Sequence, residues 1–82
     1  MSKRKDPLLK TFGWRVRQLR EAKHWTQELL AERADLDRSY IAGIEAGLRN
    51  PSLKAIARIA RGLGTSLAHL FENVPAAVEK KS

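Results

Sequence analysis

The 82-residue sequence contains no cysteine. This absence excludes disulfides, thiolate metal sites and cysteine nucleophiles, and it fits a reducing compartment. Long apolar runs are also missing: none approaches the ~18 residues of a membrane span. The basic start, Met1 to Lys5, is not followed by the apolar segment of a signal peptide. We therefore expect a cytoplasmic protein without a membrane partner.

Combinations of residues that are typical of enzyme active sites are missing as well. We find no acid–base pair, nucleophile elbow, phosphate-binding loop or metal cluster in the sequence. His24 and His69 have no partners at metal-ligand spacing, so we interpret them as ordinary surface or boundary residues. The sequence therefore predicts neither an enzyme nor a protein with a metal or cofactor, and no small-molecule ligand is evident.

What the sequence does have is positive charge. Sixteen Lys and Arg against nine Asp and Glu give a formal net charge of +7. In so small a domain this favours a polyanion as the partner. Charge alone does not decide the function, because many proteins are basic and several of these cations lie near the ends of the chain (Lys3, Arg4, Lys5, Lys80 and Lys81).

Apolar residues recur at steps of three and four throughout, and no useful stretch alternates with a period of two. This spacing, with its capping residues, predicts an all-α fold of five short helices. Their expected ranges are Pro7 or Leu8 to about Lys23, Gln27 to about Ala34, Arg38 to Ala46, Leu53 to Leu63, and Leu67 to Asn73. The expected N-caps are Thr26, Asp37, Ser52 and Ser66, and Gly47 and Gly64 are expected to close helices. We expect a domain over residues 7–75, between a basic extension (1–6) and a flexible tail (76–82).

The second and third helices are separated only by Asp35-Leu36-Asp37. So short a turn forces a steep crossing and leaves the second helix of the pair protruding. Ile41 and Ile44 are expected to face inward, which leaves Arg38, Ser39, Ala42 and Gly43 outside. This pattern indicates a helix-turn-helix from about Thr26 to Ala46, whose second helix contacts base edges with its N-terminal residues.

The stretch WTQELLAERADLDRSYIAGIEAGLRNPSL resembles the helix-turn-helix of the phage-repressor and Cro-like (XRE) family, and the likeness covers about Phe12 to Phe71. Within that family, DRSYIAGIEAGLRNPSL is most similar to the controller proteins of restriction–modification systems, which are small homodimeric transcription regulators. The resemblance implies a five-helix, lambda-repressor-like domain that binds double-stranded DNA sequence-specifically as a homodimer.

The resemblance also implies roles for individual residues. The expected base contacts are Arg38, Ser39, Tyr40 and Gly43, and the expected backbone contacts are Thr26, Gln27, Arg49 and Asn50. Arg20 and Glu45 match a structural ion pair of the family. The candidates for the dimer interface are Leu67, Leu70, Phe71 and Val74, with at least one of Leu70 and Phe71 expected in the core instead. Arg38 leads the base contacts, because arginine pairs bidentately with guanine.

Alternatives remain at several positions. Arg38 could be a solvated surface arginine, and Tyr40 could be an aromatic at the edge of the core. The basic stripe of Lys54, Arg58 and Arg61 is interpreted as a solvated helix face rather than a DNA contact.

The sequence also departs from the family pattern. Asp35 stands at a turn position that glycine usually occupies, and Leu29 replaces the glutamate of a capping box. Ala46 replaces a common Arg or Asn. Because Ala42 and Gly43 carry no long side chain, specificity is expected to depend on Arg38, Ser39 and DNA shape.

Two other functions stay open. An antitoxin that regulates its own operon would have the same DNA-binding features. A protein-interaction module could have kept this fold and lost DNA binding, although the basic charge and the retained Gln27, Arg38, Arg49 and Asn50 argue against that alternative.

Overall fold

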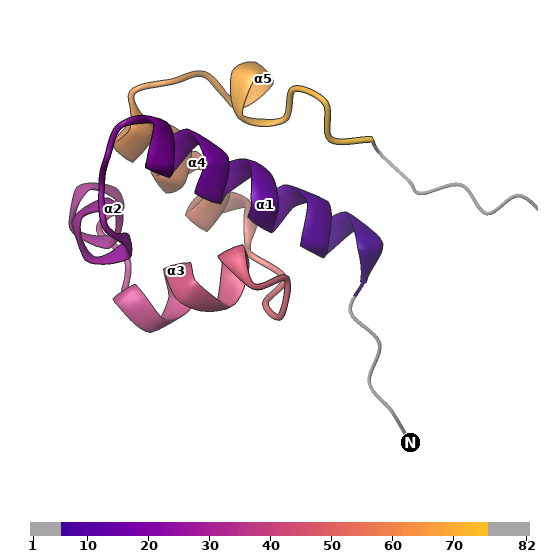
Figure 1. The fold of residues 1–82 in the computed structure, drawn as a ribbon, viewed down its shortest axis with the longest axis horizontal. Coiled ribbons are helices and arrows are strands. Elements are labelled where there is room, and N and C mark those ends of the chain that lie inside the picture. The colour runs from indigo at the N-terminus through magenta and orange to yellow at the C-terminus, as the bar shows by residue number, and fades with distance from the viewer. Residues whose placement is uncertain (1–5, 76–82) are drawn as a thin grey trace, which may run out of the picture.

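The computed structural model describes residues 6–75, which form five α-helices and contain no strand. The helices are α1 (Pro7–Ala22), α2 (Gln27–Ala34), α3 (Arg38–Glu45), α4 (Leu53–Leu63) and α5 (Leu67–Leu70). Figure 1 shows α1 crossing the middle of the molecule, with α3 along one edge and α5 along the opposite edge. The prediction of an all-α, five-helix fold is confirmed. The expected basic extension, apart from Asp6, and the expected tail (76–82) lie outside the described residues.

The helices begin where the sequence supplies a capping side chain. The hydroxyls of Thr26, Ser52 and Ser66 each accept a hydrogen bond of 3.0 Å from a backbone amide in the first turn of α2, α4 and α5. Asp6 does the same for α1 at 2.8 Å. Asp37 occupies the N-cap position of α3, but its side chain makes no capping hydrogen bond. The first turn of α3 therefore has no side-chain cap.

The predicted helix ends need small corrections. The first and third helices end one residue earlier than predicted, at Ala22 and Glu45, and α5 ends at Leu70 instead of Asn73. After Leu70 the amides of Glu72 and Val74 bond to carbonyls only three residues back, and Asn73 has a left-handed φ of 65°. These tight turns stop α5 after a single turn.

All five helices contribute to one apolar core. Its buried members are Phe12, Val16, Leu30, Ala31, Ala34, Ile41, Ile44, Ile59, Ala60, Leu63 and Leu70. Leu70 has no exposed surface, so of the pair Leu70 and Phe71 it is Leu70 that belongs to the core, and it is no longer a candidate for a dimer contact. Its neighbour Phe71 stays 38% exposed, while its ring stacks on Phe12 with a centroid distance of 5.0 Å.

Helices α1 and α3 approach each other at Gly13. A Cβ atom at this position would overlap the carbonyl oxygen of Ile44 and would lie 2.9 Å from that of Glu45. Only a residue without a side chain allows the two backbones to pack so closely. Gly13 therefore fixes how closely α1 packs against the C-terminal end of α3.

Within residues 6–75, no helix has the length and apolar character needed to cross a membrane.

Candidate nucleic-acid interface

The turn between α2 and α3 gives α3 its exposed position. Asp35 adopts the left-handed conformation (φ 60°, ψ 47°), which aspartate tolerates better than most residues. The Leu36 amide donates to the Ala31 carbonyl at 2.9 Å and closes the end of α2. Figure 1 shows α2 nearly end-on while α3 lies in the plane of the view, so the two helices cross steeply. The outer side of α3 is left on the edge of the described molecule.

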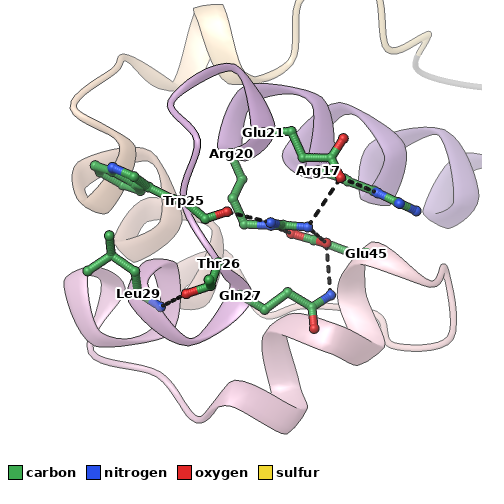
Figure 2. Close-up of polar contacts among 8 residues, drawn as sticks. All are labelled: Arg17, Arg20, Glu21, Trp25, Thr26, Gln27, Leu29 and Glu45. Carbon is green, nitrogen blue, oxygen red and sulfur yellow. Dashed lines mark hydrogen bonds and ion pairs between the residues drawn. The ribbon is translucent and has the colours of Figure 1, made fainter.

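A buried ion pair holds α3 against α1. The Arg20 guanidinium donates to both carboxylate oxygens of Glu45, at 2.7 and 2.9 Å, and to the Trp25 carbonyl at 2.6 Å (Figure 2). The side chains of Arg20 and Glu45 are only 10% and 3% exposed. The hydrogen bond to Glu45 raises the pKa of Arg20 above its usual value, against the opposing effect of burial. The two residues predicted to pair are thus in direct contact.

Gln27 joins this network at the start of α2. Its side-chain amide donates to Glu45 Oε1 at 2.9 Å, and Figure 2 shows its carbonyl oxygen pointing away from Glu45. An amide group has two N–H bonds, so the contact with Glu45 uses only one of them. The sequence did not predict the contact with Glu45. Through it, the Glu45 carboxylate connects α3 to both α1 and α2, and Arg20 extends the network to the Trp25 carbonyl in the loop before α2.

The exposed stripe of α3, made of Arg38, Ser39 and Ala42, lies between two groups of residues. Successive side chains turn by about 100° around a helix, which places Arg38, Ala42 and Ser39 next to one another. On one side of this stripe is Glu45 with Gln27, and on the opposite side are Tyr40 and Gly43. Arg38 and Ser39 are exposed, and within residues 6–75 neither side chain forms a hydrogen bond or an ion pair. The Arg38 guanidinium and the Ser39 hydroxyl therefore have no hydrogen-bond acceptor within the described residues.

Arg49 follows α3 and lies on the Tyr40 side of the stripe. Its guanidinium carbon is 5.2 Å from the centre of the Tyr40 ring, and its stem covers Gly43. Tyr40 is partly buried against the core, and its hydroxyl accepts a hydrogen bond of 3.3 Å from the Ser52 amide. Tyr40 is thus an aromatic at the edge of the core that still presents a hydroxyl. Asn50 is exposed in the same loop.

Thr26 lies on the Gln27 side. Its hydroxyl oxygen accepts from the Leu29 amide, but a hydroxyl also has a hydrogen to donate. The expected backbone contacts therefore flank α3 from both sides, with Thr26 and Gln27 on one side and Arg49 and Asn50 on the other.

Residues 16–70 match the family model described as helix-turn-helix. The chain belongs to the helix-turn-helix family. The controller protein C.MunI of a Mycoplasma species is 42% identical over 64 residues, which cover 77% of this chain and 86% of that protein. This likeness confirms the family and the controller-type resemblance predicted from the sequence.

Solved structures give the same result for the fold. The restriction–modification controller protein C.AhdI from Aeromonas hydrophila superposes with a TM-score of 0.75 at 48% identity, covering 77% of this chain and 96% of that one. The controller protein C.Esp1396I, solved as a tetramer with its natural 35 base-pair operator, gives a TM-score of 0.76 at 39% identity and covers 82% of this chain and 88% of that one.

In this helix-turn-helix protein, α5 and the residues that follow it contain the remaining candidates for a dimer interface. Leu67 is 44% exposed and Phe71 38% exposed, while Val74 is partly buried against the core. The Arg15 guanidinium holds this short helix on α1, because it donates to the carbonyls of His69 at 2.6 Å and Leu70 at 3.3 Å. The sequence did not predict this role of Arg15, and the one feature that hints at it is the position of Arg15 beside the apolar stripe of α1.

Within residues 6–75, no group of three or more His, Cys, Asp or Glu could hold a metal ion.

Proposed function

We propose that this chain is a sequence-specific DNA-binding transcription regulator that acts as a homodimer and controls restriction–modification genes. The observation that carries the proposal is the arrangement around α3. An exposed stripe that starts with Arg38 and Ser39 is flanked on both sides by groups suited to phosphates. A helix that enters the major groove lies between two phosphate backbones, and this arrangement fits both of them.

The base contacts come from the N-terminal half of α3. Arg38 reads a base pair, with guanine as the favoured partner because its two acceptors match the guanidinium. Ser39 supports this contact with its hydroxyl. Tyr40 lies deeper at the edge of the stripe, where its hydroxyl reaches a phosphate or a base. Ala42 adds little bulk between these residues and the groove floor, so the helix approaches closely.

The backbone contacts position the protein without reading sequence. Thr26 and Gln27 bind one strand from the start of α2, where backbone amides also favour an anion. Arg49 and Asn50 bind the other strand from the loop after α3. Since Glu45 holds Gln27 in place, the distance between α2 and α3 is set before DNA arrives.

Dimerisation follows from the small size of one reading surface. A single recognition helix contacts too few base pairs for a genome-scale search, whereas two helices about 34 Å apart read two half-sites on one face of the duplex. We assign the contact between subunits to Leu67, Phe71 and Val74. We place the DNA-binding domain at residues 7–75 of a cytoplasmic protein without enzymatic activity.

The test begins with selection of bound sequences from a random duplex pool. Affinity for the selected site and for a scrambled duplex is then measured by fluorescence anisotropy at several salt concentrations. We expect half-sites with twofold symmetry. The logarithm of the binding constant should fall with the logarithm of salt by about 0.9 for each phosphate contact.

Two variants make this test specific. Arg49→Ala should weaken binding to both duplexes alike, because it removes a phosphate contact. Arg58→Ala removes the same charge from the exposed face of α4 and should change affinity much less. If the wild-type protein bound no duplex in a salt-dependent way, the DNA-binding proposal would be wrong, and a protein-interaction module would take its place.

A further inference from the structure

Gly43 is the sixth of the eight residues of α3 and lies inside the helix. Glycine costs a helix interior about 1 kcal/mol relative to alanine, so its presence there needs a reason. The backbone does not supply one, because Gly43 is not among the residues with a positive φ. The described fold supplies another reason, a close neighbour over the missing side chain.

That neighbour is Arg49. A Cβ atom on Gly43 would lie 2.6 Å from Cγ of Arg49, 3.5 Å from Nε and 3.6 Å from Cδ. The stem of Arg49 therefore runs directly across the backbone of α3, in the space that any other residue at position 43 would fill.

Tyr40 holds the other end of the same side chain. Residues three apart share one helix face, so the Tyr40 ring follows Gly43 along the path of Arg49, with the guanidinium carbon 5.2 Å from the ring centre. The ring is itself fixed, because it packs against the core and its hydroxyl accepts from the Ser52 amide. Arg49 thus has a gap for its stem and an aromatic face for its charge.

We propose that Gly43 and Tyr40 form a seat that positions Arg49 beside the recognition helix before DNA binds. This inference rests on the proposed function and deepens it, since it gives Gly43 a positioning role in place of the expected base contact. A guanidinium held over an aromatic ring by a cation–π contact still has N–H bonds free to donate to a phosphate. Because the arginine is ordered during folding, less of its side-chain freedom is lost when DNA binds.

The decisive variant is Gly43→Ala. The added methyl group improves the helix propensity of α3 and displaces the Arg49 stem into solvent. We expect the melting temperature of the free protein to stay the same or rise, while operator affinity falls about tenfold per subunit, the effect of losing one charge-assisted contact. A purely structural role of Gly43 would lower both quantities together.

A double-mutant cycle tests whether the two residues act as one unit. Arg49→Ala should reproduce the loss of affinity seen for Gly43→Ala, and the double variant should lose little more than either single variant. Tyr40→Leu, which removes the aromatic face, should give a smaller loss in the same direction. If the two losses multiplied in the double variant, or if Gly43→Ala bound like the wild type, the seat would be refuted.

A second measurement needs no DNA. The Tyr40 ring should shift the NMR signals of the Arg49 side-chain protons upfield, and this shift should disappear in Gly43→Ala. If the shift is absent in the wild type, the seat does not form in solution, even if operator binding is intact. If the shift is present but no duplex binds in a salt-dependent way, the proposed function fails and the seat remains only a feature of the fold. The two failures are therefore distinguishable.

Discussion

The Glu45→Ala variant tests how the helix-turn-helix is held together. The substitution removes three hydrogen bonds, two from Arg20 at 2.7 and 2.9 Å and one from Gln27 at 2.9 Å. It leaves the Arg20 guanidinium buried with the Trp25 carbonyl and with Glu21, whose exposed carboxylate is 3.8 Å away. A buried charge thus loses its main partner, while α3 loses its polar connection to α1 and α2 and keeps only its apolar packing.

The expected cost is large for so small a domain. Removing one partner of a buried ion pair costs about 3–5 kcal/mol, and we expect the lower end, about 3 kcal/mol, because the Trp25 carbonyl and Glu21 still face Arg20. A domain of this length has a total stability of about 4–12 kcal/mol. At about 4–8 °C for each kcal/mol, the melting temperature should fall by about 12–24 °C.

Urea and thermal unfolding, followed by circular dichroism, measure this loss. Glu21→Ala is the matched control, because its carboxylate also binds an arginine of α1 at 3.0 Å but is 53% exposed, so its loss should stay below about 1 kcal/mol. The effect of Glu45→Ala should persist in about 1 M salt, which screens exposed pairs far more than buried ones. If the two variants lost equal stability, or if salt abolished the difference, the buried pair would not brace the fold as we argue.

Three further predictions concern other parts of the molecule. Arg38→Ala should lower operator affinity and relax preference at one base pair per half-site by about 1–3 kcal/mol, as measured by repeating the selection; an unchanged preference would contradict its base-reading role. Arg15→Met should raise the dissociation constant of the dimer in sedimentation equilibrium, because α5 loses its clamp, whereas Arg17→Met on the exposed face of α1 should not. Gly13→Ala should destabilise the fold by about 2 kcal/mol or more through overlap with the Ile44 carbonyl, and a variant as stable as the wild type in urea would exclude that overlap.

Most of the fold could be predicted from the sequence, because it depends on interactions between residues that are close together along the chain. The caps at Thr26, Ser52 and Ser66 and the left-handed turn at Asp35 depend on residues at most five positions apart. Such interactions form in the same way wherever the helix docks, so their spacing along the chain is sufficient to predict them. The combination of Thr-Gln, Tyr-Ile-x-x-Ile-Glu and Arg-Asn-Pro-Ser likewise indicated the family.

Leu70 and Phe71 show where the sequence was insufficient. Both are apolar neighbours in a single helical turn, and a rotation of about 100° separates their directions. Which of them enters the core depends on how α5 docks against α1, which the spacing of apolar residues does not specify. The Arg15 clamp that holds α5 joins residues 54 and 55 positions apart, so it exists only once that docking has occurred.

The sequence by itself thus determined the five helices and the helix-turn-helix, and it supplied the residues that we propose to contact DNA. Only the tertiary structure decided what holds those residues in place: Glu45 beneath Gln27, and Gly43 and Tyr40 beneath Arg49. The physical reason is that a helix needs only its own neighbours to form, whereas the position of a side chain on its surface depends on the backbones that pack around it.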